Sequence, residues 1–323
     1  MKVYKVIGLG GAVLLLSASA LSEYVYIDKW GRYGEGLGYF DQPANVDVAP
    51  NGNVYVADTV NYRIQYFTSV GSWLGVWGVI GSGPGQFYAP FDVSIAPNGN
   101  VYVVEHRNCR VQYFTPTGSH LGMWGAPGSG NGEFLAPFGL SIAPNGNVYV
   151  VEYGNYRVQC FTSTGSFVGK WGSEGSGNGE FGFVYGIGVA PNGNVYVADT
   201  GNNRIQYFTP AGSFLGKWGS SGVGNGQFHG VMDIDVSSDG RVFAIESHGY
   251  RVQYFTLNGS FLGKWGSRGS GPGEFEKPWG LAVTTGGVLV YVADNENHRI
   301  QYFKWTEPAV APTSLGRIKA LFE

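Results

Sequence analysis

Five polar side chains recur at matching positions along the chain and are the candidates for metal chemistry. They are Asn45, Asp47, Asp92, Asp233 and Asp235, which lie in short apolar stretches that return about every 47 residues. Carboxylate and amide oxygens are the ligands that calcium prefers in proteins. If these stretches converge on one axis, their oxygens predict a calcium site. The alternative interpretation is a set of hydrogen-bonded polar groups that line a wet channel.

A second constellation pairs an acidic residue with an arginine five positions later, once in every repeat. The six pairs are Asp58/Arg63, Glu105/Arg110, Glu152/Arg157, Asp199/Arg204, Glu246/Arg251 and Asp294/Arg299. An acid and an arginine on either side of a turn favour a charge-assisted hydrogen bond that holds the hairpin together. Because catalysis has no use for six equivalent copies, we interpret the pairs as structural.

The histidines argue against a catalytic zinc ion. His106, His248 and His298 lie in the loops that follow the acidic residues, His120 lies on a strand, and only His229 lies near the start of an apolar stretch. A zinc site needs about three convergent ligands. The sequence also lacks a Gly-x-Ser-x-Gly elbow, and the spacing brings no nucleophile and base together.

The residue at the start of each apolar stretch differs between repeats. In a repeat protein, the positions that vary from one repeat to the next are candidates for functional residues. The six residues are Ala44, Phe91, Phe138, Tyr185, Met232 and Trp279. Two interpretations stay open, because bulky side chains can simply close a channel mouth or can form a contact ring for a ligand. Under the second interpretation the binding residues are Phe91, Phe138, Tyr185, Met232 and Trp279, with His106, Arg107, Tyr153 and His248 on the surrounding loops.

The elements that position these residues follow from an internal repeat. The segment VYVADTVNYRIQYF, Val54–Phe67, has five further copies, and the arginines of successive copies are 47, 47, 47, 47 and 48 residues apart. So long and regular a period indicates an array of identical supersecondary units. Each period contains four short strands, and the Asn-Gly pair between the first two predicts a hairpin turn with positive φ at both residues. Four antiparallel strands per period predict a propeller blade.

The two ends of the array complement each other. The last repeat stops near Trp305 without a fourth strand, whereas Tyr24–Trp30 aligns with a fourth strand that has no partners of its own. We expect the N-terminal strand to complete the last blade, which removes an open sheet edge. The predicted fold is therefore all-β, a six-bladed β-propeller of four-stranded antiparallel blades over residues 21–305.

Glycine-rich loops precede the apolar stretches and superficially resemble phosphate-binding loops. A nucleotide-binding loop follows a strand and opens a helix, whereas these loops connect one blade to the next. Each loop ends in a phenylalanine that we expect to fill the gap between blades. These residues are Phe87, Phe134, Phe181, Phe228 and Phe275.

The two ends of the chain do not follow the repeat. Lys2 and Lys5, an apolar run over residues 7–16 and a small-residue cleavage motif predict a signal peptide over residues 1–20. We therefore expect an exported protein without a transmembrane segment after cleavage. Residues 306–323 are interpreted as a linker and a short tail, either a frayed terminus or a docking or sorting segment.

Charge and cysteine content narrow the partners. The chain has 20 basic and 23 acidic residues, and removal of Lys2 and Lys5 leaves 18 basic residues and a net charge of about −5. Six of the remaining basic residues are the paired arginines, so no basic stripe is left for nucleic acid. Cys109 and Cys160 occupy different repeat positions, and we expect no disulfide between them.

The frame Gly-x-Gly-x-Gly-x-Phe, then Val-Tyr-Val-Ala-Asp, then Asn-x-Arg-Ile-Gln-Tyr-Phe resembles the NHL repeat over about residues 24–305. The resemblance implies a six-bladed β-propeller that serves mostly as a binding platform, although amidating lyases, streptogramin lyases and calcium-dependent lactonases are relatives. We expect a monomeric binding or scaffold module for a protein, peptide or glycan, with no cofactor. The alternative is a calcium-dependent hydrolase or lyase that uses the acidic positions. Function has to be argued from sites, because the repeat identifies only the scaffold.

Overall fold

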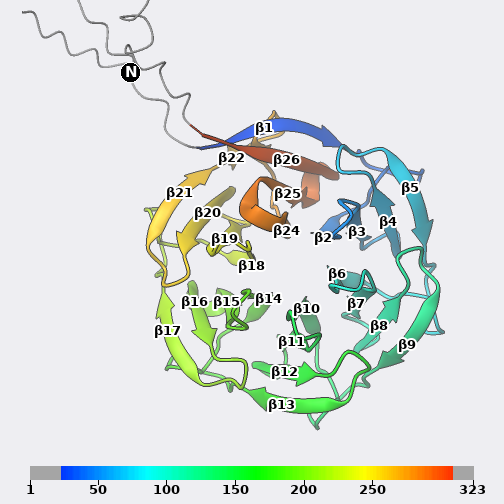
Figure 1. Ribbon diagram of the computed structural model, residues 1–323, viewed down its shortest axis with the longest axis vertical. Coiled ribbons are helices and arrows are strands. Elements are labelled where there is room, and N and C mark those ends of the chain that lie inside the picture. The colour runs from blue at the N-terminus through cyan, green and yellow to red at the C-terminus, as the bar shows by residue number, and fades with distance from the viewer. Residues whose placement is uncertain (1–22, 308–323) are drawn as a thin grey trace, which may run out of the picture.

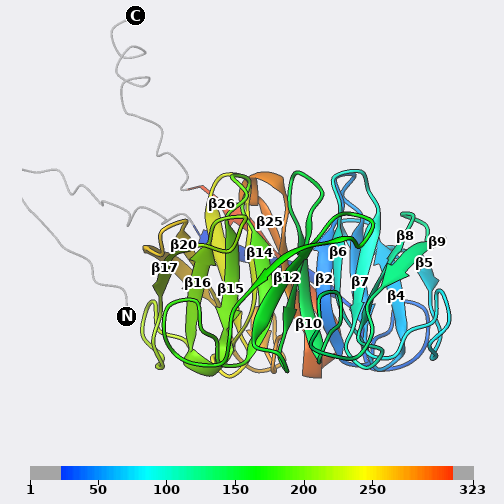
Figure 2. The same ribbon diagram turned by 90° about the horizontal axis from the view of Figure 1, so that it is seen from below.

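The computed structural model describes residues 23–307, and it confirms the all-β prediction. Six four-stranded antiparallel sheets stand around a central axis like the blades of a propeller (Figure 1). Within each sheet the first strand of the repeat lies nearest the axis and the fourth lies at the rim. Viewed from the side, the molecule is a disc, and its inner strands run from one face to the other (Figure 2).

The blades are numbered in the order of their first strands. Blade 1 comprises β2 (Pro43–Val48), β3 (Val54–Asp58), β4 (Arg63–Phe67) and β5 (Trp73–Trp77); blade 2 comprises β6 (Pro90–Ile95), β7 (Val101–Glu105), β8 (Arg110–Phe114) and β9 (His120–Trp124); blade 3 comprises β10 (Pro137–Ile142), β11 (Val148–Glu152), β12 (Arg157–Phe161) and β13 (Phe167–Trp171). Blade 4 comprises β14 (Val184–Val189), β15 (Val195–Asp199), β16 (Arg204–Phe208) and β17 (Phe214–Trp218); blade 5 comprises β18 (Val231–Val236), β19 (Arg241–Glu246), β20 (Arg251–Thr256) and β21 (Phe261–Trp265); blade 6 comprises β24 (Leu281–Val283), β25 (Leu289–Asp294), β26 (Arg299–Thr306) and β1 (Glu23–Trp30).

The remaining elements are short and lie in the loops. They are the parallel pair β22 (Ser267–Arg268) and β23 (Glu274–Phe275) and the 3-10 turns η1 (Thr200–Asn202), η2 (Thr285–Gly287) and η3 (Asn295–Asn297). In the described part of the chain, no helix is long and apolar enough to cross a membrane. The predicted signal peptide and all but the first two residues of the predicted tail lie outside the described residues.

The ring closes as the sequence predicts. Strand β1 pairs antiparallel with β26, from Glu23 opposite Thr306 to Trp30 opposite Ile300, and so forms the fourth strand of blade 6. The hydroxyl of Tyr24 also donates a hydrogen bond to the carbonyl of Gly287, 2.5 Å away. The first and last strands of the described residues are therefore neighbours, and the closed ring leaves none of the six blades incomplete.

The turn between the first and second strands differs from the prediction. Gly52 has a φ of 86°, but Asn51 does not have a positive φ, so the prediction of positive φ at both residues was wrong. The N–H of Gly52 donates to the carbonyl of Ala49 at 2.8 Å, and the N–H of Ala49 donates to the carbonyl of Asn53 at 2.9 Å. The physical reason is the length of the loop, because a three-residue hairpin loop favours a type I turn followed by a left-handed glycine. Pro50 fits this turn but is not required for it, since blade 5 makes the same turn with Ser238 at that position.

The core lies between neighbouring blades. Phe40 and the five predicted phenylalanines at the ends of the glycine loops are fully buried, which confirms their packing role. Between blades 1 and 2, for example, the ring of Phe87 lies 5.6 Å from the ring of Phe114. A Cβ atom on Gly78 would lie 2.4 Å from the Phe87 ring, so glycine is required where the chain leaves the fourth strand. Cys109 and Cys160 are free thiols, as expected.

Candidate binding site at the central channel

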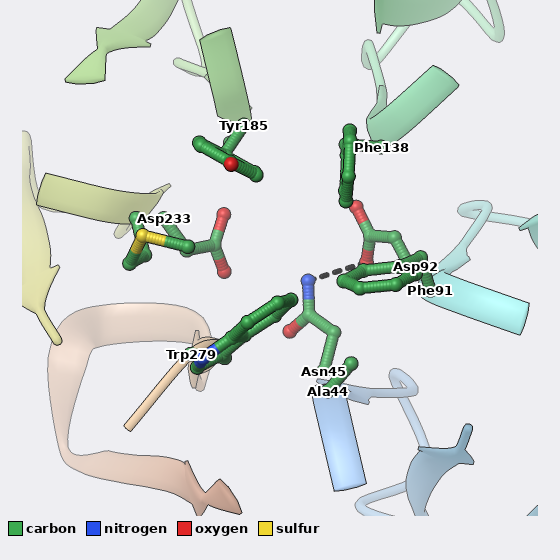
Figure 3. Close-up of a pocket in the computed structure, with 11 residues that line it drawn as sticks. Ala44, Asn45, Phe91, Asp92, Phe138, Tyr185, Asp233 and Trp279 are labelled. Atoms are coloured by element: carbon green, nitrogen blue, oxygen red, sulfur yellow. Dashed lines mark hydrogen bonds between the residues drawn. The ribbon is translucent and has the colours of Figure 1, made fainter. Parts of the chain in front are cut away.

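The six differentiated residues at the starts of the first strands do converge at one end of the central channel. Together with the residues that follow them, they line a pocket of about 280 Å³ (Figure 3). The lining side chains are Ala44, Phe91, Phe138, Tyr185, Met232 and Trp279, with Asn45, Asp92 and Asp233 beneath them. One strand position in each blade therefore builds a single mouth from residues that are about 47 positions apart in the sequence.

Four aromatic side chains form a connected cluster in this mouth, which we call the mouth cluster: Phe91, Phe138, Tyr185 and Trp279. The ring of Phe138 meets the rings of Phe91 and Tyr185 edge to face at 4.6 Å and 4.7 Å. Trp279 lies 5.0 Å from Phe91 and 6.3 Å from Tyr185. All four side chains are half-buried. The rings thus pack against one another and still present apolar surface to solvent, so the two interpretations of the sequence are compatible.

Two of the predicted loop residues extend the mouth cluster. The imidazole of His106 lies 4.4 Å from the Phe138 ring, and the Tyr153 ring lies 5.7 Å from it. Burial and the neighbouring charge of Arg107 lower the pKa of His106, which keeps the imidazole neutral at pH 7. Both residues therefore add uncharged ring surface to the mouth.

Phe183 is a member of this surface that the sequence analysis did not identify. Its ring stacks on Tyr153 at 4.7 Å and an interplanar angle of 7°, and the side chain is 44% exposed. The sequence does distinguish Phe183, because the other blades carry smaller or polar residues at this loop position. Those residues are Gln42, Ala89, Ala136, Gly230 and Lys277.

Two predicted binding residues do not reach the mouth. Arg107 and His248 are exposed, and neither lines the pocket. The imidazole of His248 instead lies 5.4 Å from that of His229, and its Nδ1 atom is 3.0 Å from the hydroxyl of Ser247. Met232 does line the pocket but is almost fully buried, so it forms wall rather than contact surface.

The five acidic and amide positions converge just below the mouth cluster. The side-chain amide of Asn45 donates to Asp92 Oδ1 at 2.5 Å, and Asp233 stands across the channel from this pair (Figure 3). A second pocket of about 290 Å³ continues along the axis and is lined by all five positions. The predicted convergence on one axis is therefore correct.

The carboxylates nevertheless use their oxygens within the fold. Each accepts a hydrogen bond from a backbone N–H in the first strand of the next blade, 48 residues further along the chain. The bonds run from Ile95 to Asp47 at 2.7 Å, from Leu140 to Asp92 at 2.7 Å, from Leu281 to Asp233 at 3.1 Å and from Val283 to Asp235 at 2.7 Å. These aspartates thus join neighbouring blades at the channel wall.

Glycine replaces the carboxylate where neighbouring first strands approach more closely. A Cβ atom on Gly139 would lie 2.3 Å from the carbonyl oxygen of Tyr185, and one on Gly186 would lie 2.4 Å from the Cα of Asp233. Contacts this short leave no room for any side chain. The unequal distribution of acids among the blades therefore follows from how the first strands pack.

Burial controls the charge of the channel. Burial, followed by the charge of Asp235, raises the pKa of Asp47 to about 8. Burial also raises the pKa of Asp92 and Asp233, and for Asp92 the next cause is the Asp233 charge. Among the described residues, no lysine, arginine or histidine lines either pocket to offset these charges. A protonated carboxyl group is therefore the expected state of Asp47 at neutral pH, and burial favours the protonated form of Asp92 as well.

The calcium hypothesis stays a prediction. Within residues 23–307, no three histidine, cysteine, aspartate or glutamate side chains are arranged to hold a metal ion. The oxygens proposed as ligands accept backbone N–H groups, which is poorly suited to a calcium shell of six to eight oxygens. The calcium content of protein purified without a chelator tests the hypothesis directly.

A wider cavity that the sequence analysis missed lies at the other end of the channel. It is an open depression of about 1230 Å³, a volume that includes the solvent at its entrance, and it is bordered by the last residues of the first strands and the turns that follow them. Its apolar wall consists of Val48, Ile95, Ile142, Val189, Val236 and Val283. The sequence signal for it is a valine or isoleucine at the end of every first strand, followed by Ala-Pro in four of the six repeats.

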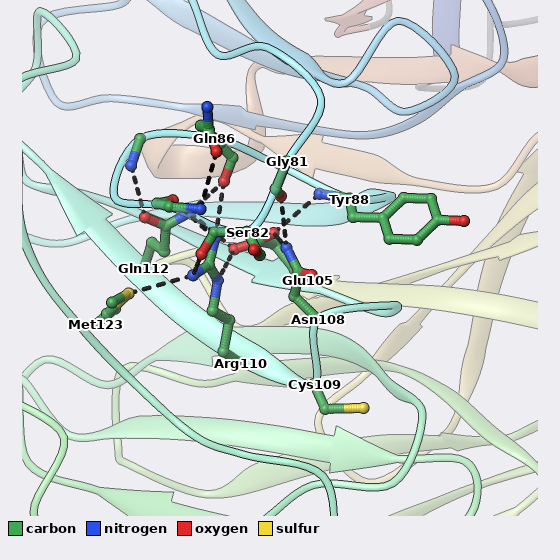
Figure 4. A network of polar contacts seen from close by, with 12 residues as sticks. Gly81, Ser82, Gln86, Tyr88, Glu105, Asn108, Cys109, Arg110, Gln112 and Met123 are labelled. Carbon is green, nitrogen blue, oxygen red and sulfur yellow. Dashed lines mark hydrogen bonds and ion pairs between the residues drawn. The ribbon is translucent and has the colours of Figure 1, made fainter.

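The six acid/arginine pairs are structural, and they join more than a hairpin. In blade 2, Arg110 Nε lies 2.5 Å from Glu105 Oε1, and both groups are buried (Figure 4). The guanidinium also donates to three carbonyls of the preceding glycine loop, those of Ser82 at 2.5 Å, Gly83 at 3.1 Å and Gln86 at 2.9 Å. The ion pair therefore fixes the loop that connects two blades. The other five pairs have distances of 2.5–2.7 Å.

The fold and the channel define the class of protein as a six-bladed β-propeller. The model of the NHL repeat matches residues 40–67, 134–161, 181–208 and 275–303, which contain the first three strands of blades 1, 3, 4 and 6. The chain is thus an NHL-repeat protein, as its sequence indicates. No curated protein matches it.

Several solved structures have a similar fold. A catalytically inactive virginiamycin B lyase from Staphylococcus aureus with quinupristin is 15% identical, with a TM-score of 0.56 over 90% of this chain and 89% of that chain. A streptogramin B lyase is 12% identical, with a TM-score of 0.58 over 88% and 98%. A protein of unknown function from Bacteroides thetaiotaomicron is 15% identical, with a TM-score of 0.61 over 90% and 71%. At these identities the likeness concerns the fold alone.

Proposed function

We propose that this propeller is an exported binding or scaffold module that holds a protein, peptide or glycan partner on the mouth cluster. The observation that carries the proposal is the half-buried aromatic surface formed by Phe91, Phe138, Tyr185 and Trp279 at one end of the channel. Rigid aromatic rings provide a large contact area at a small cost in side-chain entropy. They stack on sugar rings and on apolar peptide side chains alike.

The loop residues around the mouth support the same function. Phe183 is 44% exposed and stacks on Tyr153, which in turn contacts Phe138. The aromatic surface therefore spreads from the channel onto the surrounding face of the disc. This surface is larger than closure of the channel mouth alone would require. Hot spots of protein interfaces are enriched in such aromatic residues.

Binding to glycan and peptide arrays tests the proposal. We expect ligands that bind the wild-type protein to lose at least about tenfold in affinity in Phe138→Ala and Trp279→Ala, since each removes a central ring. Tyr33→Ala is the matched control, because Tyr33 is an exposed aromatic residue that does not line the mouth. Binding that survives both substitutions would show that the mouth is not the interface.

Export is the second part of the proposal and is tested separately. The motif over residues 1–20 supports cleavage by a signal peptidase. We expect the released protein to begin at Leu21 when its N-terminus is sequenced. Retention of the first twenty residues in a cell-associated protein would contradict export by cleavage.

A hydrolase or lyase that acts at the acidic positions is the second candidate function. Asp233 favours it, because this residue lines both channel pockets and burial raises its pKa to about 7, which suits a general acid or base. Under this hypothesis, turnover of lactones and related substrates is lost in Asp233→Asn and on chelation of calcium. Turnover that is unaffected by both changes would exclude it.

A further inference from the structure

Within residues 23–307, the outermost strand of every blade has a free edge. The sheets end at β5, β9, β13, β17, β21 and β1, and these strands form the rim of the disc in Figure 1. A free edge presents unpaired backbone N–H and C=O groups that can pair with another strand. Proteins commonly protect such an edge with a lysine, whose charge opposes burial in a new sheet.

Four of the six rim strands carry this protection and two do not. The protected strands have an exposed lysine at the same position: Lys29, Lys170, Lys217 and Lys264. Blade 1 has Val76 there and blade 2 has Met123. Met123 is exposed too, but its sulfur accepts a hydrogen bond from Arg110 at 3.3 Å, and the residues on either side of β9 are Ser119, Gly125 and Ala126 rather than large apolar ones. Val76 is exposed and leaves the edge of β5 unprotected.

The unprotected edge is flanked by further exposed apolar side chains. Trp73 and Leu74 lie on β5, Val70 lies in the turn before the strand, and Val79 and Ile80 follow it; Val79 and Ile80 are each 60% exposed. The segment from residue 70 to 80 contains no charged residue. The loops at the positions of Val79 and Ile80 in most other blades are polar. A contiguous exposed apolar strand of this kind marks an interaction surface.

The sequence of β5 indicates which partner fits. It reads Trp-Leu-Gly-Val-Trp over Trp73–Trp77, which is nearly the same in both directions about Gly75. Antiparallel pairing about a two-fold axis at Gly75 places Leu74 opposite Val76 of a second copy and tryptophan opposite tryptophan. A two-fold interface requires this self-complementarity. The same pairing of β17 or β21, which read Phe-Leu-Gly-Lys-Trp, would place a lysine opposite a leucine.

In place of the monomer expected from the sequence, we propose that two copies of this chain associate through β5, edge to edge and antiparallel, so that the two first blades form one continuous eight-stranded sheet. The interface lies at the rim, whereas the mouth cluster lies on the axis, so the proposal does not depend on the proposed function. One five-residue strand with its flanking side chains is a small interface. We therefore expect a reversible dimer with a dissociation constant on the order of micromolar.

Sedimentation equilibrium of the purified protein over a wide concentration range is the first test. The wild-type protein is expected to show a monomer–dimer equilibrium. Val76→Lys introduces the lysine that four other blades carry, and it occurs twice in a two-fold dimer, so the dissociation constant should rise at least about tenfold. Leu215→Lys on β17 adds the same charge to a different rim strand and should leave the equilibrium unchanged. A wild-type protein that stays monomeric, or a dimer that persists in Val76→Lys, would overturn the proposal.

Paired cysteines test the register. In Leu74→Cys/Val76→Cys, each new thiol faces its counterpart in the second copy, and mild oxidation should produce a covalent dimer that is cut by reductant. Leu215→Cys/Lys217→Cys is the matched control on β17 and should remain monomeric under the same conditions. Equal cross-linking of both variants would overturn the assignment to β5. So would a monomer whose β5 edge is instead occupied by an extended segment of another protein.

Discussion

The indole of Trp279 lies 5.0 Å from the ring of Phe91, although blade 1 stands between the two blades that carry them. Blade 1 has Ala44 at the corresponding position, and its methyl group leaves a gap that Trp279 spans. Trp279 also approaches Tyr185 on the far side of blade 5. One large side chain thus completes the mouth cluster across the two blades that lack an aromatic residue.

This relationship predicts the effect of filling the gap. Ala44→Phe places a ring where Trp279 now bridges to Phe91, so we expect the indole to be displaced and the affinity for a mouth ligand to fall about tenfold or more. Overpacking of this site should cost about 1–3 kcal/mol of stability, which a protein of this size tolerates. The measurements are ligand affinity and tryptophan fluorescence, with Ala44→Ser as the control. Wild-type affinity in Ala44→Phe would contradict a role for the bridge.

The buried ion pairs predict a large and equal contribution to stability in each blade. Arg110→Met leaves Glu105 buried without its counter-charge and frees three loop carbonyls, so the free energy of unfolding should fall by about 3–5 kcal/mol. Lys277→Met is the control, because Lys277 and Glu296 form an exposed pair whose loss should leave the urea midpoint unchanged.

A second substitution separates the loss of the arginine from the isolation of the acid. Arg110→Met/Glu105→Gln removes both charges, and we expect it to be more stable than Arg110→Met alone. Equal stability of the single and double variants would show that the carbonyl contacts, rather than the uncompensated carboxylate, dominate the loss.

The fold could be predicted because each blade repeats the same local rules. Asn51-Gly52 indicated a hairpin, the six repeat arginines indicated six blades, and the orphan strand Tyr24–Trp30 indicated the closure. The detail that failed was the backbone of the turn, since the Asn-Gly pair indicates a two-residue loop whereas the loop has three residues, Pro50, Asn51 and Gly52. Local patterns are therefore sufficient for the architecture and less reliable for single dihedral angles.

The site could be predicted only in part. Aligning the repeats brought the mouth cluster together correctly, because equivalent positions must lie around one axis in a closed ring. The alignment could not show that Asp47 binds the backbone of Ile95 in the next blade, since that bond depends on the spacing between blades. Nor could it show that Phe183 turns toward Tyr153, because this loop departs from the repeat.

The buried carboxylates predict an unusual pH dependence. Burial raises the pKa of Asp47 to about 8 from an ordinary value of 3.8, so between these values the folded protein holds a proton that the unfolded chain has lost. The free energy of unfolding must then fall as the pH rises through this window, by up to about 1.4 kcal/mol per pH unit for one group. Asp92 and Asp233 shift in the same direction and add to the slope.

Asp47→Ser isolates the contribution of one carboxylate. Serine is the residue that blades 2 and 3 carry at this position, as Ser94 and Ser141, so the channel accommodates it. The variant loses the hydrogen bond from Ile95 and should be less stable at pH 4, but its stability should fall less steeply as the pH rises. Urea unfolding at several pH values between 4 and 8 measures both slopes, with the exposed Asp28→Ser as the control for loss of a charge. Equal slopes in the wild-type protein and Asp47→Ser would mean that Asp47 ionises normally in the fold, and the channel would then carry negative charge at neutral pH.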